Sequence, residues 1–263
     1  MKKFILNKCI FALLSVVLVF VFTFILMLQI PGDPFLDEQG VPTEIYESLK
    51  NHHGLNDTVS LQFLRYLKNV FSLNFGFSLV YKGLSVREII ASNLPVSLTL
   101  GLQAIVLSIP LGLFIGIYAT LKKNTWQEKI VMLLVIGAIS LPNFILSTFL
   151  QYVLAIKLDL LPVARYENFS QTIMPTLALS ALPTAFIARL TLAKLSDEYE
   201  KPYVVAARAK GLSESKILFR HVLRNIMPPI LSYIGPLSAQ VMTGSFIVEK
   251  NNCYSWTWHM VHQ

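Results

Sequence analysis

Hydrophobic positions are gathered into five long runs, separated by segments that hold most of the charged residues. A helix needs about 20 mostly apolar residues to cross a bilayer. The runs are Cys9–Ile30, Pro95–Leu121, Ile130–Ile156, about Thr172–Ala188, and Asn225–Val248. The first run follows three lysines, but it is too long for the apolar core of a signal peptide and no A-x-A-like site follows it. The pattern therefore predicts an all-α polytopic membrane protein with five transmembrane helices.

The segment between the first two runs, residues 31–94, is too long for a plain loop and contains two helical patterns. Apolar residues recur at helical spacing between Val59 and Val70. Further on, Ser85 and Glu88 have the spacing of a capping box, which predicts a second short helix. We expect both to be amphipathic helices on the outer face of the membrane.

Composition agrees with a membrane protein, because 54% of the residues are hydrophobic, only 14% are charged, and the mean hydropathy is +0.58. Soluble domains carry about 25% charged residues. The net charge of +7 is typical of basic cytoplasmic loops in a membrane protein, so it does not indicate nucleic-acid binding. Cys9 lies in an apolar run and Cys253 near the end, which favours neither a disulfide framework nor a zinc knuckle.

Lysine and arginine gather in alternate connecting segments, and this orients the chain. The N-terminus, the loop at 122–129 and the segment Arg189–Arg224, with eight basic residues, are predicted to be cytoplasmic. The predicted parts are an N-terminal cytoplasmic end with the first span (1–30), an external helical segment (31–94), a core of four spans (95–249) with a cytoplasmic loop at 189–228, and an atypical tail (250–263).

The cytoplasmic loop has the signals of two short helices joined at a glycine, and we call residues 200–225 the hook. Pro202 suits the first turn of a helix, Gly211 suits the left-handed residue that ends one, and Ser213 suits the N-cap of the next. The stretch 206–209 is rich in alanine, and small side chains let a helix sit deeply in a groove of a partner. A solvated amphipathic connector is the alternative interpretation, and these residues alone do not decide between the two.

The hook and the residues after it read YVVAARAKGLSESKILFRHVLRNIMPPI, which resembles the cytoplasmic loop of ABC importer permeases. The family's general pattern is E-A-A-x3-G-x9-I-x-L-P. Ala206, Ala207 and Gly211 match it, Val205 replaces the glutamate, and H-V-L-R replaces I-x-L-P. These departures are similar to the subfamily for dipeptides, oligopeptides and nickel, which reads Y-V-x-x-A-R-A-K-G-L and later R-H-x-L-R-N.

Further resemblances follow in the family's order and extend over residues 1–249. They are Pro31–Pro34, Leu73–Ser78 (in place of G-D-x-G-x-S, with Leu73 and Asn74 replacing the Gly and Asp), Leu141–Phe144, Leu161–Val163, Met174–Leu177 and Gly244–Glu249. On these matches the chain is similar to the B-type permease of the pair.

The resemblance implies one subunit of an ATP-driven importer in a bacterial inner membrane. It implies a second permease as heterodimer partner, two ATP-binding subunits on the cytoplasmic side, and an extracytoplasmic substrate-binding protein. The residues implicated in coupling to the ATPases are Tyr203, Ala206, Ala207, Arg208, Ala209, Lys210, Gly211, Leu212, Arg220, His221, Arg224 and Asn225.

The chain itself is expected to perform no chemistry and to hold no catalytic site, metal or cofactor. It has no phosphate-binding glycine-rich loop and no H-E-x-x-H sequence. The predicted spans contain no acidic residue, which argues against a proton- or sodium-driven carrier.

Peptides are the expected substrate, because they define the broader branch of the subfamily, and nickel is the alternative. Two other classes are open, and the first of them would explain the spans equally well but not the ordered motifs. One is a non-transporting membrane protein, such as an assembly factor or a polytopic enzyme. The other is the product of a damaged permease gene that transports nothing.

Two sets of side chains raise the question of a metal site. His52 and His53 are adjacent, so their side chains diverge and a shared ion is not expected. Cys253, His259 and His262 lie in the tail and would make a zinc site only if the tail were a functional element.

The tail does not resemble the family's continuation, V-E-x-I-F-x-I-P-G-L-G followed by a sixth span. A single-base insertion near Lys250 would explain it, because the codons of Trp256 and Trp258 become glycine codons in the shifted frame, at the family's spacing. We therefore interpret residues 251–263 as an out-of-frame ending, and neither a zinc site nor an aromatic membrane anchor is expected there.

Overall fold

The computed structural model describes residues 2–29, 57–78, 83–162 and 168–251. These residues form helices and connecting turns, with one isolated antiparallel bridge between Phe77 and Ser85. The elements are α1 (Lys2–Gln29), α3 (Val59–Phe71), α4 (Val86–Leu121), α5 (Trp126–Ser140), α6 (Asn143–Leu150), the π-helical turn η1 (Gln151–Lys157), α7 (Phe169–Tyr199), α8 (Pro202–Ala209), α9 (Glu214–Ile217), the π-helical turn η2 (Leu218–Val222) and α10 (Leu223–Asn251). The predicted all-α class is confirmed.

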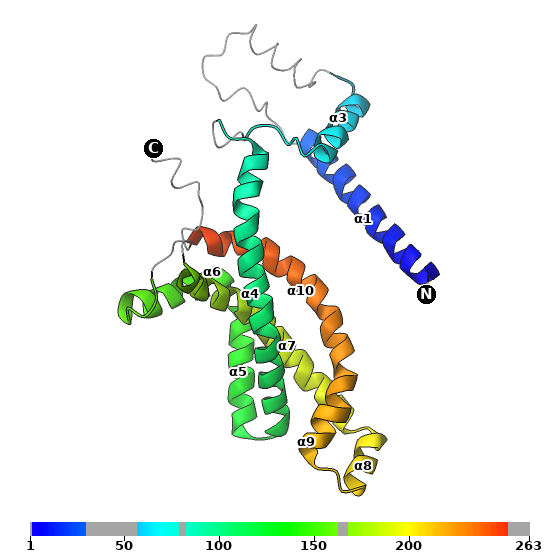
Figure 1. The fold of residues 1–263 in the computed structure, drawn as a ribbon, viewed down its shortest axis with the longest axis vertical. Coiled ribbons are helices and arrows are strands. Elements are labelled where there is room, and N and C mark those ends of the chain that lie inside the picture. Colours follow the sequence, from blue (N-terminus) through cyan, green and yellow to red (C-terminus); the bar gives the residue numbers. More distant parts are fainter. Residues whose placement is uncertain (1, 30–56, 79–82, 163–167, 252–263) are drawn as a thin grey trace. The chain divides into compact units, whose positions relative to one another are not determined.

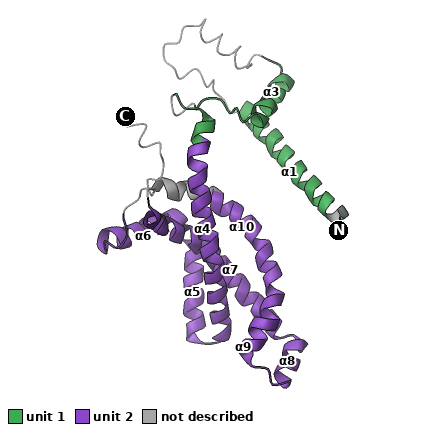
Figure 2. Cartoon of the chain, in the orientation of Figure 1, with its two compact units in different colours: residues 1–89 green, residues 90–263 purple. Residues whose placement is uncertain are grey.

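The chain forms two compact units, residues 1–89 and 90–263 (Figure 2). In the first unit the predicted amphipathic helix is present as α3, and its half-buried face meets α1. The ring of Phe24 lies 5.1 Å from that of Phe63 and 5.8 Å from that of Tyr66. The predicted domain boundaries stay predictions.

The capping box at the start of α4 is confirmed. The Ser85 backbone N–H donates to Glu88 Oε2 at 3.0 Å, and the Glu88 N–H donates to Ser85 Oγ at 3.2 Å. The helix that begins there was expected to be short, but it continues without a break through Pro95 to Leu121. Proline is tolerated inside such apolar helices because neighbouring groups can satisfy the carbonyl that it leaves free.

Within the described ranges, three helices are long and apolar enough to cross a membrane: Ile5–Gln29 of α1, then α4 and α7. The predicted third span, Ile130–Ile156, is not straight, because the helices on either side of Leu141 and Pro142 meet at 108°. Leu141 is extended (φ −84°, ψ 126°), as the residue before a proline usually is. Counted as one span, this bent pair makes a fourth. The fifth predicted run lies in α10, a continuous helix that does not meet the same criterion, so a count of five stays a prediction.

Helix α7 is the centre of the second unit (Figure 1). Leu179 is buried with Leu100 of α4 and Val241 of α10, and Ala188 is buried with Val135 of α5. A third buried cluster joins α7 to the hook and to the start of α10. The hook therefore shares its core with two long helices.

Two glycines bring α4 close to α7. A Cβ added to Gly112 would lie 2.7 Å from the Ile187 Cβ, and one added to Gly116 would lie 2.5 Å from the Thr191 Cβ. Small residues four apart permit this kind of close helix packing in membranes. Gly112 and Gly116 therefore serve helix packing.

Candidate functional site

The hook is built as its sequence predicts. Helix α8 begins at Pro202 and is ended by Gly211, which has φ +76°. The Gly211 N–H donates to the Arg208 carbonyl at 2.9 Å, and the Leu212 N–H donates to the Ala207 carbonyl at 3.2 Å. These two bonds form a Schellman motif, in which glycine adopts the left-handed conformation without strain. The chain thus turns sharply back towards α10.

The second arm of the hook begins at Ser213, the N-cap of α9, although its side chain makes no capping bond. Glu214 instead binds the first arm. Arg208 Nε donates to Glu214 Oε1 at 2.5 Å and its Nη2 donates to Oε2 at 3.2 Å, and the guanidinium lies 5.5 Å from the Tyr199 ring centre. The hydrogen bond from Arg208 lowers the pKa of Glu214. Arg208, one of the residues predicted to meet a partner, is thus paired within its own chain.

One face of α8 is turned into the protein. Val204 is fully buried and Ala207 is 9% exposed. They share a core cluster with Ile217, with Val222 and with Ile226 of α10. This apolar contact holds α8 against the two long helices.

The opposite face of α8 is open, and we call Val205, Ala206 and Ala209 the outer face. All three side chains are exposed, and that of Val205 is 57% exposed. Two of the three alanines predicted to dock on a partner therefore lie on the outer face, and the third, Ala207, serves the core. A short helix thereby presents a small, flat apolar surface, with exposed Lys210 beside it.

The carboxylate of Glu198 joins the two ends of the hook. Glu198, near the end of α7, is 7% exposed, and its Oε1 accepts hydrogen bonds from Tyr203 Oη at 2.7 Å and from Asn225 Nδ2 at 2.9 Å. Lys201 Nζ lies 2.5 Å from the other oxygen, Oε2. Burial, followed by the hydrogen bond to Glu198, raises the pKa of Tyr203, so its phenol stays protonated and donates. We call these four residues the basal cluster.

Sequence reasoning predicted Tyr203 and Asn225 as site residues but missed Glu198. The sequence carries one signal, because Thr191, Leu195 and Glu198 are spaced by four and then three positions and so share one helical face. The structure buries all three side chains. A carboxylate in a buried stripe requires partners.

The remaining predicted site residues lie on the second arm and are not brought into one pocket. Arg220 and Arg224 are exposed, and His221 is half-buried. The two arginines add positive charge to the outside of the hook. His52, His53 and the tail from 252 onward lie outside the described residues.

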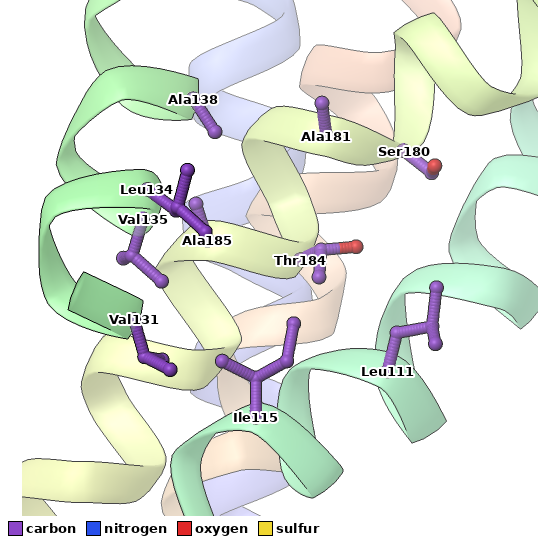
Figure 3. Close-up of a pocket in the computed structure, with 10 residues that line it drawn as sticks. All are labelled: Leu111, Ile115, Val131, Leu134, Val135, Ala138, Ser180, Ala181, Thr184 and Ala185. Atoms are coloured by element: carbon purple, nitrogen blue, oxygen red, sulfur yellow. The ribbon is translucent and has the colours of Figure 1, made fainter. Parts of the chain in front are cut away.

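A cavity of about 300 Å³ opens between α4, α5 and α7. Among the described residues that line it, only Ser180 and Thr184 carry a hydroxyl group, and Ser180 Oγ already donates to the Leu177 carbonyl at 3.0 Å. Figure 3 shows aliphatic side chains around most of it. The lining is Leu111, Ile115, Val131, Leu134, Val135, Ala138, Ser180, Ala181, Thr184 and Ala185. Such a lining offers almost no hydrogen bonds to a peptide backbone, so the cavity is not assigned as a substrate site.

The apolar spans define the class of multi-pass membrane proteins, and comparison with known proteins specifies the family. The profile of a family described as "Binding-protein-dependent transport system inner membrane component" matches residues 108–251. A second profile, "Binding-prot-dependent transport system membrane comp, N-term", matches residues 1–101. The chain therefore belongs to the family of inner-membrane components of binding-protein-dependent transport systems.

Several similar proteins are named as transport system permeases. The dipeptide transport system permease protein DppB of Bacillus subtilis (strain 168) is 37% identical over 90% of this chain and 77% of its own length. DppB of Lactococcus lactis subsp. cremoris (strain MG1363) is 38% identical over 95% of this chain and 82% of its own length. The oligopeptide transport system permease protein OppB of Salmonella typhimurium (strain LT2) is 34% identical over the same two shares, 95% and 82%. These relatives are transport permeases, not enzymes.

Proposed function

We propose that this chain is a permease subunit of an ATP-driven peptide importer, and that its hook couples it to separate ATP-hydrolysing subunits. The N-terminus and the hook lie on the cytoplasmic side of the membrane. A second permease completes the translocation pore, and a binding protein delivers peptide from outside.

The observation that carries this proposal is the two-sided burial of α8. Val204 and Ala207 are locked into a core shared with α7 and α10, while Val205, Ala206 and Ala209 are exposed. A helix held in this way can transmit a push, and its small outer side chains let a groove on a partner approach the backbone closely. Exposed Lys210, which directly follows α8, is suited to pairing with an acidic group at the rim of that groove.

The mechanism follows from rigid packing. Closure of two ATPase subunits on ATP would move the hook, and the shared core would carry that movement into α7 and α10. Packed helices respond as rigid bodies, so the pore would alternate between inward- and outward-facing states. The chain supplies binding and movement, and the partners supply the hydrolysis.

Peptide is proposed as the substrate because the three relatives described above are named for dipeptide or oligopeptide transport. Nickel is the alternative substrate within the same subfamily. The binding protein is expected to select the substrate, since it is the component that first captures it.

The test is reconstitution with two ATPase subunits, a second permease and a binding protein of a peptide importer from the same organism. We expect co-purification with two ATPase subunits and ATP-dependent uptake of labelled dipeptide into proteoliposomes. Uptake of nickel and not of peptide would identify nickel as the substrate. ATPase binding without any uptake would support the damaged-gene interpretation, and the absence of both would refute the importer.

A further inference from the structure

We infer that Glu198 is a positioning residue that sets the angle of the hook against α7 and α10, so that a push on the hook moves both helices together. This inference rests on the proposed coupling function of the hook, and it adds a residue and a physical role that the sequence motif does not include.

The first step is topological. The hook leaves α7 and returns to α10, and both ends meet at the same carboxylate. Tyr203 from α8 and Asn225 from α10 donate to one oxygen of Glu198, at 2.7 and 2.9 Å. Asn225 Nδ2 is also 3.1 Å from Tyr203 Oη, so the two sides of the hook touch each other there as well.

The second step separates what the core does from what the basal cluster does. Apolar contacts such as those of Val204 and Ile217 oppose separation of the hook, but they are non-directional. Hydrogen bonds weaken steeply as their angles depart from linearity. A rotation of α8 about its base would therefore strain the bonds to Glu198 before it disturbed the apolar core.

The third step concerns charge. Glu198 is 7% exposed and has Lys201 Nζ 2.5 Å from one oxygen. A carboxylate this deeply buried is tolerated only with its partners in place. Neutralising it would release Lys201 and weaken the bonds from Tyr203 and Asn225, because bonds to a charged acceptor are stronger than bonds to a neutral amide. The outer face of α8 would be unchanged, so ATPase binding should persist while transmission of movement weakens.

The experiment uses the full chain in the complete reconstituted importer and measures peptide transported per ATP hydrolysed. We expect Glu198→Gln to lower this ratio about fivefold, within the range by which residues outside ligand sites modulate coupling. Asp197→Asn is the matched control, because Asp197 is the exposed neighbour and makes no hydrogen bond or ion pair with the described residues. The Asp197→Asn protein should transport as much peptide per ATP hydrolysed as the wild type.

A spectroscopic measurement reports the hook angle directly. Spin labels at Ser215 on α9 and Leu231 on α10, both exposed, are introduced after serine replaces the two native cysteines. Glu198→Gln should broaden the distance distribution between the labels, and Asp197→Asn should leave it narrow. Loss of folding alone would reduce the amount of protein without changing either the ratio or the width.

A charge exchange provides the rescue. Asn225→Asp alone places a second carboxylate against Glu198, so the ratio should fall at least as far as in Glu198→Gln. The double variant Glu198→Gln/Asn225→Asp restores one amide and one carboxylate, and it should recover to within about twofold of the wild type, as paired groups do when their interaction is restored.

Two results would overturn the inference: a wild-type ratio with a narrow distribution in Glu198→Gln, or a double variant no better than either single change. Failure of the proposed function is distinguishable from both. In that case the wild-type chain would bind no ATPase, and the label distances would still decide whether Glu198 sets the hook angle.

Discussion

Val204 and Val205 are neighbours in α8 with the same side chain and opposite surroundings. Val204 is fully buried in the core shared with α7 and α10, and Val205 is 57% exposed on the outer face. The same division runs through the alanines, because Ala207 is inside and Ala206 is outside. Adjacent residues of one sequence motif thus have two roles. Some hold the hook in the core and others are exposed to a partner, and only the packing of the helices shows which residue does which.

The largest effect should come from introducing a charge at each of these two valines. Val204→Asp buries an unpaired carboxylate and should destabilise the protein by about 4 kcal/mol or more, visible as lost monodisperse protein and a lower Tm in detergent. Val205→Asp should keep the wild-type Tm and lose ATPase co-purification. Equal destabilisation by both substitutions would remove the distinction between the two faces.

The next effect concerns bulk on the outer face. Ala209→Trp should weaken ATPase binding more than tenfold, because the groove can no longer approach the α8 backbone, while Tm stays unchanged. Ser215→Trp is the control, since Ser215 is exposed on α9 outside the outer face. Affinity measured by surface-immobilised ATPase separates the two, and similar losses in both would show that the contact surface is not α8.

A smaller effect should follow from the turn that allows α8 to present two faces. Gly211 has φ +76°, and an added Cβ would meet no atom within 4 Å. Gly211→Ala should therefore lower the free energy of unfolding by about 1 kcal/mol, because alanine is strained in the left-handed conformation. Gly211→Asn should lower it by less. Gly137→Ala, at a helical glycine with equally open surroundings, should not destabilise the protein. Tm measurements of the three variants make the comparison.

The smallest effect should come from the Arg208–Glu214 pair, because both side chains are about half exposed, at 45% and 57%. The pKa of Glu214 is lowered in the folded protein, so its stabilisation is present above the unfolded pKa of about 4.3 and is lost as the pH falls through the folded value. The contribution should stay within about 0.5 kcal/mol. The Tm difference between wild type and Arg208→Met should shrink between pH 7 and pH 3.5 and in high salt, and a constant difference would contradict the pairing.

Local signals in the sequence predicted local structure well. Helix α8 begins at Pro202 and is ended by Gly211, as expected, and the capping box of Ser85 and Glu88 starts α4. Each of these features depends on one or two residues and on bonds to the adjacent backbone, so no distant contact was needed to predict it.

The prolines inside apolar runs were harder to interpret. Pro142 accompanies a 108° bend in a run that was expected to be one span, whereas Pro95 lies inside an unbroken helix that was expected to divide there. The local cost of a proline is similar in both places. Whether the helix bends depends on which neighbours satisfy the freed backbone groups, and those neighbours come from elsewhere in the chain.

The sequence by itself determined the membrane class, the place of the hook, its helix–glycine–helix construction and the family. Periodicity and the backbone preferences of proline and glycine are properties of short stretches, and they survive in any arrangement of the helices. Only the tertiary structure decided which side of α8 is buried and that Glu198 meets Tyr203 and Asn225. The reason is that the pairing joins Glu198 to Asn225, 27 positions away, and the buried cluster joins residues still further apart. Their meeting is set by how α7, α8 and α10 pack together.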